Sequence, residues 1–121
     1  MSSGMQVPLV LLPRFSTFAG VATFRTLPLD VSAYVNVSLN IWRAALCGTA
    51  PTYAITIEES TDQVTWSTVS GTTASYDPGS DTEGPQNGAL RKRWMRATIV
   101  LAGANPVATC WAIGFLEQRQ G

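Results

Sequence analysis

Acidic side chains are the first candidates for catalysis in this chain of 121 residues, and their arrangement does not suit it. Glu58 and Glu59 are adjacent, so on an extended strand they point to opposite faces and cannot form the carboxylate pair of a glycosidase. The chain has no histidine, which removes the usual general base near neutral pH and the commonest transition-metal ligand. No glycine-rich phosphate loop follows a predicted strand. We therefore expect a protein that is not an enzyme and that binds no cofactor.

The other acidic residues fall in stretches rich in serine, threonine and glycine, which are typical of turns and loops. Asp62 lies in such a stretch and is predicted to bond the backbone of a turn. Asp77, Asp81 and Glu83 offer oxygen atoms of the kind that bind calcium, but their spacing is not that of a known calcium loop. The sequence therefore predicts a turn at Asp62 and no metal site.

One basic cluster, made of Arg91, Lys92, Arg93 and Arg96, holds half of the 8 Lys and Arg residues. Trp94 lies within it, so stacking on bases and contacts to phosphates are one interpretation. The 8 basic residues are balanced by 8 acidic residues, however, and zero net charge does not favour phosphate binding. We favour an ordinary start of a strand, whose charges are solvated or matched, and expect no specific nucleic-acid partner.

Tryptophan side chains offer a second kind of binding surface, because sugars stack on aromatic rings. The four tryptophans are Trp42, Trp66, Trp94 and Trp111. Trp66 and Trp111 align with residues predicted to lie in the core, which leaves Trp42 and Trp94 as candidates for a sugar platform.

The two cysteines, Cys47 and Cys110, lack the CxxC spacing of a redox or zinc site. We favour two small buried side chains without a covalent bond, which is how free cysteine usually packs. A disulfide between them, or a bond between subunits, stays open. Two cysteines do not make a disulfide scaffold, so a reducing compartment is preferred.

Alternation of apolar and polar residues predicts β-strands in the first half of the chain. Residues 15–27 predict one or two short strands broken at Gly20. The clearest strand runs from Tyr34 to Ile41, where every second residue from Val35 is aliphatic. Residues 53–69 predict a hairpin, in which Val64, Trp66 and Thr68 share one face of the returning strand.

The second half of the chain predicts two more long strands. Residues 94–101 are apolar on both faces, as in a central strand, and a turn follows at residues 102–106. Residues 108–117 predict a final strand on which Trp111, Ile113 and Phe115 are aligned. Residues 70–88 lack periodicity and are expected to form loops, with one weak strand near residues 72–76.

About six to eight strands separated by turns, without helical periodicity, indicate an all-β fold built as an antiparallel β-sandwich. A jelly-roll or an immunoglobulin-like arrangement would both fit. The composition is 45% hydrophobic and only 13% charged. A monomer usually carries about twice that charged share. The low charge therefore favours a subunit whose surface is covered by partners.

Residues 1–14 are expected to form an extended N-terminal arm, followed by a single β-sandwich domain at residues 15–121. Pro8 and Pro13 exclude a helix or a central strand from the apolar stretch between Gln6 and Arg14. The alternative to an arm on a neighbouring subunit is a first edge strand that closes the domain's own core. The stretch is far shorter than the ~20 residues of a membrane span and does not match a signal peptide, so we expect no membrane association and synthesis in a host cytoplasm.

Four motifs, LPLDVSAY (27–34), IEESTDQVTW (57–66), KRWMRATIVL (92–101) and CWAIGFLE (110–117), resemble small β-sandwich structural proteins of tailed-bacteriophage virions. The resemblance implies a capsid decoration or cement protein that binds the assembled head lattice and stabilises it. The implied partners are the major capsid protein and further copies of the chain, often as a trimer, with contacts made by buried surface and by strand addition at sheet edges. A carbohydrate- or receptor-binding module of a phage tail is the alternative.

For such a virion protein we expect the arm and the basic cluster to make the partner contacts. The residues concerned are Val7, Leu9, Leu11, Leu12, Arg14, Arg91 and Arg93.

Overall fold

The computed structural model describes residues 5–69, 74–75 and 79–119, and every regular element in these ranges is a β-strand. In chain order the strands are β1 (Gln6–Ala19), β2 (Ala22–Arg25), β3 (Leu29–Asp30), β4 (Tyr34–Arg43), β5 (Cys47–Ser60), β6 (Ser67–Thr68), β7 (Ala74–Ser75), β8 (Thr82–Ala89) and β9 (Trp94–Gln118). The all-β prediction is confirmed. No helix capable of crossing a membrane is found among the described residues.

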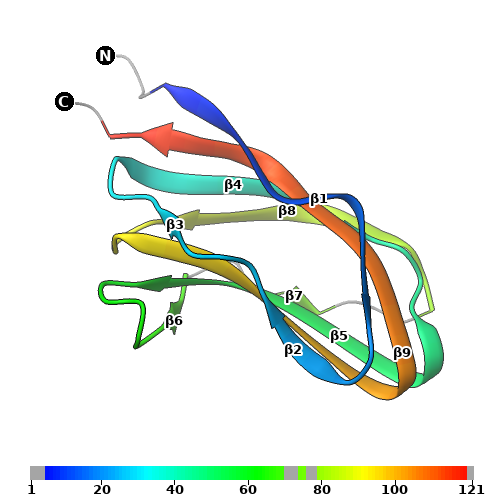
Figure 1. The fold of residues 1–121 in the computed structure, drawn as a ribbon. Coiled ribbons are helices and arrows are strands. Elements are labelled where there is room, and N and C mark those ends of the chain that lie inside the picture. The colour runs from blue at the N-terminus through cyan, green and yellow to red at the C-terminus, as the bar shows by residue number, and fades with distance from the viewer. Residues whose placement is uncertain (1–4, 70–73, 76–78, 120–121) are drawn as a thin grey trace.

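The long strand β9 organises the fold, because it runs through both halves of one curled antiparallel sheet (Figure 1). Its first half pairs with β5 on one side and with β2 and β3 on the other. Its second half pairs with β4 on one side and β1 on the other, and β8 adds to the far side of β4. The two halves of the sheet face each other, which gives the jelly-roll-like form of an antiparallel sandwich.

Glycines allow β5 and β9 to bend together where the sheet curls. Gly48 and Gly103 both adopt a φ of 114°. A side chain at Gly103 would meet the carbonyl oxygen of Ala50 at 2.7 Å, and one at Gly48 would meet that of Asn105 at 2.7 Å. The pairing register of β5 shifts at the same place, as is typical of β-bulges. The turn predicted at residues 102–106 is therefore a bend within a continuous strand.

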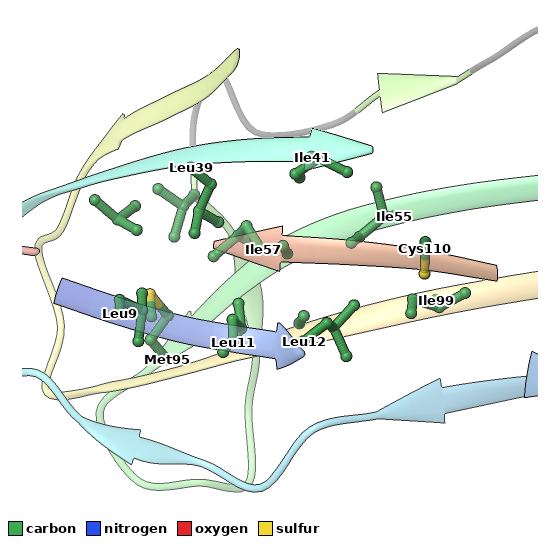
Figure 2. Close-up of a cluster of buried hydrophobic side chains, with 14 of the residues drawn as sticks. Leu9, Leu11, Leu12, Leu39, Ile41, Ile55, Ile57, Met95, Ile99 and Cys110 are labelled. Atoms are coloured by element: carbon green, nitrogen blue, oxygen red, sulfur yellow. The ribbon is translucent and has the colours of Figure 1, made fainter. Parts of the chain in front are cut away.

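The core lies between the two halves of the sheet, and Figure 2 shows leucine and isoleucine side chains meeting there. The buried hydrophobic residues are Leu9, Leu11, Leu12, Val31, Val37, Leu39, Ile41, Tyr53, Ile55, Ile57, Val69, Leu90, Met95, Ala97, Ile99, Leu101, Ala108, Cys110, Ala112 and Leu116. On β4 the buried residues alternate with Asn36, Ser38 and Asn40, as the sequence predicts.

The final strand faces the opposite way from the predicted one. Ala108, Cys110 and Ala112 point into the core, whereas Trp111, Ile113 and Phe115 lie on the solvent side of the sheet. The prediction took the largest side chains as the inner ones. This part of β9 is flanked by β1 and β4 and covered by large residues from the other half, so small side chains fill the inner positions.

Residues 6–14 belong to β1, an edge strand that pairs with β9 from Gln6↔Glu117 onward. The segment is therefore the edge strand of the alternative interpretation, not an arm that leaves the domain. Leu11 and Leu12 are both buried although they are adjacent, because the register of β1 shifts between Val10 and Leu12. Pro8 lies in this edge strand, where proline is tolerated.

The hairpin predicted at residues 53–69 is present, but its returning limb is short. β5 begins already at Cys47, and only Ser67 and Thr68 of β6 pair back onto it. The prediction that Val64 begins the returning strand is wrong, since Val64 lies in the turn before β6 and is 81% exposed. Asp62 holds Val64 and Thr65 in the turn, because its carboxylate accepts hydrogen bonds from their backbone N–H groups at 2.8 and 2.9 Å. These bonds lengthen the turn and shorten the returning strand.

The stretch expected to be loops contains a full strand, β8, paired with β4 along its whole length. Its sequence, TEGPQNGA, has low strand propensity and no apolar alternation, so pattern analysis missed it. β8 is the edge strand beyond β4 and contains Pro85. Of the predicted weak strand at residues 72–76, only β7 falls among the described residues.

Candidate functional site

Glu58 and Glu59 both form hydrogen bonds within the protein's own fold. Glu58 accepts hydrogen bonds from Arg96 Nε at 2.8 Å and from Thr98 Oγ1 at 2.6 Å. The Arg96 guanidinium lies 4.0 Å over the ring of Trp66. Glu58, Trp66 and Arg96 therefore form a structural unit that ties β5, the hairpin and β9 together.

Glu59 points the other way, as adjacent strand residues must, and is buried. Its Oε1 accepts hydrogen bonds from the backbone N–H groups of Arg91 and Lys92, at 2.8 and 3.1 Å. The carboxylate thus fixes the turn that leads into β9, and the two glutamates form no catalytic pair.

The basic cluster is largely matched by neighbouring groups. Arg93 forms an ion pair with Asp30 at 3.0 Å and lies 5.0 Å over the ring of Trp94. Hydrogen bonds from Ser32, together with Arg93, hold the pKa of Asp30 below its usual value. Lys92 donates to Ser67 Oγ at 2.9 Å. This arrangement agrees with the prediction of a strand start with matched charges.

The acidic set considered for calcium does not converge in the described part of the chain. Asp81 accepts a hydrogen bond from the backbone of Ala45 at 2.8 Å, and Glu83 accepts one from Asn40 at 2.6 Å. Asp77 lies outside the described residues. Among those described, no three His, Cys, Asp or Glu side chains are placed to hold a metal ion.

The residues predicted to contact partners fall into four environments. Leu9, Leu11 and Leu12 are buried in the domain's own core, where they are not available to a neighbour. Val7 is half-buried in β1, and Arg93 is engaged with Asp30. The remaining two, Arg14 and Arg91, are exposed.

The solvent side of strands β1, β9, β4 and β8, called the outer face below, carries exposed apolar side chains beside polar ones. The pairing register places these side chains in rows that cross the strands. One row is Val10, Ile113, Asn40 and Pro85, and the next is Pro8, Phe115, Ser38 and Asn87.

An apolar groove of about 630 Å³ runs between these two rows. Its floor is the row of backbone at Leu9, Gly114 and Leu39, which face away from solvent or have no side chain. A Cβ at Gly114 would lie 2.9 Å from the Cα of Leu39 and closer still to the carbonyl oxygen of Ser38. Glycine is therefore required where β9 and β4 approach each other beneath the groove.

Phe115 forms a ridge beside the groove, and its side chain is 46% exposed. On the other side of this ridge lies a smaller polar groove of about 220 Å³, lined in part by Gln6, Asn36, Asn87 and Glu117. The outer face thus presents an apolar groove, an aromatic ridge and a polar groove side by side.

Polar side chains of β4 are held by partners on the neighbouring strands. The bonds run from Asn36 to Glu117 at 2.6 Å, from Ser38 to Asn87 at 2.9 Å, and from Asn40 to Glu83 at 2.6 Å. These bonds fix a polar stripe along β4, parallel to the apolar stripe of Ile113 and Phe115 on β9. The bonds hold these side chains in fixed orientations on the outer face.

An aromatic cluster closes one end of the outer face. Trp42 and Trp111 stack at 4.6 Å between ring centroids, and Phe15 meets them edge-on at 5.9 and 5.7 Å. The Arg14 guanidinium lies 4.9 Å over Trp111. Phe15 has a φ of 63° and is 65% exposed, so a bulge in β1 holds this ring on the cluster with backbone strain.

Beneath this end of the sheet lies a fully buried arginine that the sequence did not reveal. Arg43 continues the inward positions of β4 and donates hydrogen bonds to the carbonyl of Ala44 at 2.7 Å and to Thr82 Oγ1 at 3.1 Å. Its guanidinium lies 5.5 Å from the ring of Tyr53. Burial raises the pKa of the nearby Cys110 thiol. These contacts are structural, because all of them lie inside the sandwich.

The cysteines agree with only part of the prediction. No disulfide joins them; Cys110 is buried and Cys47 is exposed. Trp42 and Trp94, the candidates for a sugar platform, are both half-buried. Trp42 stacks on Trp111, and Trp94 lies under the Arg93 guanidinium, so each ring already has a contact within the chain.

Comparison with known proteins identifies the fold. The sequence matches no protein-family profile and no curated protein. The PBSX exported protein XepA superposes with a TM-score of 0.62 at 17% identity, covering 95% of this chain and 38% of XepA. VP2 of infectious bursal disease virus, in derived T=1 particles, has a TM-score of 0.64 at 13% identity, covering 97% of this chain and 33% of VP2.

A carbohydrate-binding module has a related fold. The CBM22-1 xylan-binding domain of Paenibacillus barcinonensis Xyn10C superposes with a TM-score of 0.53 at 8% identity, over 100% of this chain and 99% of that domain. At these identities the similarity shows the fold alone, an all-β jelly-roll-like fold, and points to no specific family. The chain spans little more than a third of XepA and a third of VP2.

Proposed function

We propose that this chain is a non-enzymatic structural protein of a phage virion, and more specifically a capsid decoration protein that binds the assembled head lattice and stabilises it. The observation that supports this best is the spread of exposed apolar side chains over separate surfaces. Val10 and Phe115 are 62% and 46% exposed on the outer face. Val21 and Leu27 are 66% and 85% exposed beside β2, and Val100 is 46% exposed on the first half of β9.

A single apolar patch would fit one partner, whereas patches on separate surfaces fit a subunit with several neighbours. The low charged share of 13% agrees with this, because covered surfaces need little charge for solubility. The similarity of the fold to VP2 in virus particles adds support at the level of fold. In such an assembly each contact is weak and many copies bind one preformed lattice, which stabilises the folded shell.

The test is sedimentation of the purified chain with heads of the tailed phage that encodes it, followed by heating of the heads. We expect the chain to pellet with the heads and to raise the temperature at which they release DNA. Leu27→Asp should weaken binding, because it places a charge in an apolar contact. Thr49→Asp, at an exposed polar position of β5 away from these apolar residues, is the matched control and should bind normally. A chain that stays in the supernatant at all concentrations would refute the decoration role.

A carbohydrate-binding module of a phage tail is the second candidate, and the polar stripe of β4 beside Phe115 favours it. Sugars offer apolar ring faces and hydroxyl edges, which suit an aromatic ridge flanked by fixed amides. Affinity electrophoresis against neutral polysaccharides such as xylan tests this. Retardation that is lost in Phe115→Ala, but kept in Val100→Ala on the other half of β9, would support the module. Unretarded migration in every gel would exclude it for those glycans.

A further inference from the structure

The outer face is complementary to itself. The apolar groove has its floor at Gly114, and the Phe115 ridge stands in the next position along the same strand, about 3.4 Å away. A rotation of 180° about an axis that crosses the strands between these two residues exchanges ridge and groove. One copy's Phe115 ring then lies over the other copy's groove, and the reverse holds as well. Such exchange is the requirement for an isologous two-fold interface.

We propose that a second copy of this chain occupies the apolar groove, with the Phe115 ring of each copy seated in the groove of the other in a face-to-face dimer. The groove is lined by uncharged residues throughout, so it suits an uncharged aromatic ring. Its wall is apolar at Pro8, Val10 and Ile113, and no side chain rises from Gly114 to block entry.

Charges at the ends of the outer face agree with this arrangement. Glu117 lies beyond Phe115 along β9, and Arg14 lies at the opposite end, over Trp111. The same rotation places Glu117 of one copy over position 112 of the other copy's β9, which is one residue, or ~3.4 Å, from Trp111. A carboxylate and a guanidinium therefore approach each other twice in the dimer, once at each end, with zero net charge on either copy.

The size of the face is sufficient for a modest dimer. Four strands spaced ~4.8 Å apart, over seven residues at ~3.4 Å each, give about 450 Å² of flat sheet per copy before side-chain relief is counted. The pair thus buries about 900 Å² or more, near the ~1,000 Å² lower bound of biological interfaces and within the range of weak ones. A dissociation constant in the micromolar range suits this area, so dimerisation should depend on concentration.

Sedimentation-velocity ultracentrifugation of the full chain across a wide concentration range tests the proposal. We expect a monomer–dimer equilibrium in the unmodified chain. Phe115→Asp should raise the dimer dissociation constant by about 30-fold or more, the size of an interface hot-spot effect. Val100→Asp is the matched control, since Val100 is also 46% exposed and also lies on β9, but on the other half of the sheet. It should leave the equilibrium unchanged.

A second variant distinguishes a specific contact in the groove from non-specific apolar association. Val10→Phe adds apolar surface, but the larger side chain would project from the groove wall into the groove. It should therefore weaken a dimer that seats Phe115 there, whereas it would strengthen non-specific apolar association. Circular dichroism confirms that each variant is folded. A chain that is monomeric at millimolar concentration, a trimer, or a dimer unaffected by Phe115→Asp would overturn the proposal. The decoration role is judged separately, since a monomer that pellets with heads refutes only the dimer.

Discussion

Gly114 offers the sharpest test of how closely β9 and β4 are packed. Substitution by alanine adds one methyl group, which would lie 2.9 Å from the Cα of Leu39 and in steric conflict with the Ser38 carbonyl. The contact is with backbone, so rotation of a side chain cannot relieve it. The strands must separate, and overpacking of this kind costs about 1–3 kcal/mol.

Gly84 supplies the matched control for this substitution. It lies in β8 of the same half of the sheet, opposite Ile41, and a Cβ there would meet nothing within 4 Å. Gly84→Ala should therefore be neutral or stabilise by about 0.4–1 kcal/mol, through the reduced freedom of the unfolded chain. The two variants make the same chemical change, so their difference reports the local space.

Urea unfolding followed by tryptophan fluorescence measures both variants. We expect Gly114→Ala to lower the transition midpoint with an unchanged slope, and thermal melting to shift down by about 3–6 °C for each 1 kcal/mol. If Gly114→Ala unfolds at the same urea concentration as the parent chain, then β4 and β9 are not in the close approach described above, and the shape assigned to the groove floor is wrong.

Three further predictions concern the scaffold. A double-mutant cycle with Glu58→Gln and Arg96→Met should give a coupling energy of about 1–3 kcal/mol in urea unfolding, because the ion pair between these side chains is largely shielded from solvent. Additive effects of the two substitutions would contradict this coupling. Hydrogen bonds from the backbone N–H groups of Thr65 and Val64 hold the pKa of Asp62 below its usual 3.8, so this stabilisation is present above pH 3.8 and is lost as pH falls through the lowered value. Asp62→Asn should therefore flatten the decline of the urea midpoint below pH 4, and an unchanged profile would refute this role. With a thiol reagent at pH 8, the exposed Cys47 should react at once and Cys110 only after denaturation. The reason is that Cys110 is buried and its pKa is raised. Two fast-reacting thiols in the native chain would show that Cys110 is accessible.

The sequence was sufficient for the fold class and for strands whose two faces differ in polarity. β4 has aliphatic residues on one face and Asn36, Ser38 and Asn40 on the other, so its register follows directly from alternation. The break at Gly20 is also readable, and the structure gives that residue a φ of 94°.

Alternation failed where both faces of a strand carry apolar residues. In the final strand Ala108, Cys110 and Ala112 alternate with Thr109, Trp111 and Ile113, and size alone suggested that the larger set was internal. The packing of the opposite half of the sheet decides the question, and a single sequence does not contain that information. The apolar groove was missed for the same reason, because it exists only once Ile113 and Phe115 face solvent around Gly114.

The two edge prolines bear on how copies of this protein can be joined. Pro8 in β1 and Pro85 in β8 lie at opposite margins of the same half of the sheet. A proline has no N–H to offer to an added strand, so neither margin is a good template for continuing the sheet into a neighbouring molecule. Growth by strand addition, which the phage resemblance implied, is therefore disfavoured at both margins. The prolines thereby work against open-ended fibres, and under the proposed function they would direct association to closed contacts between faces.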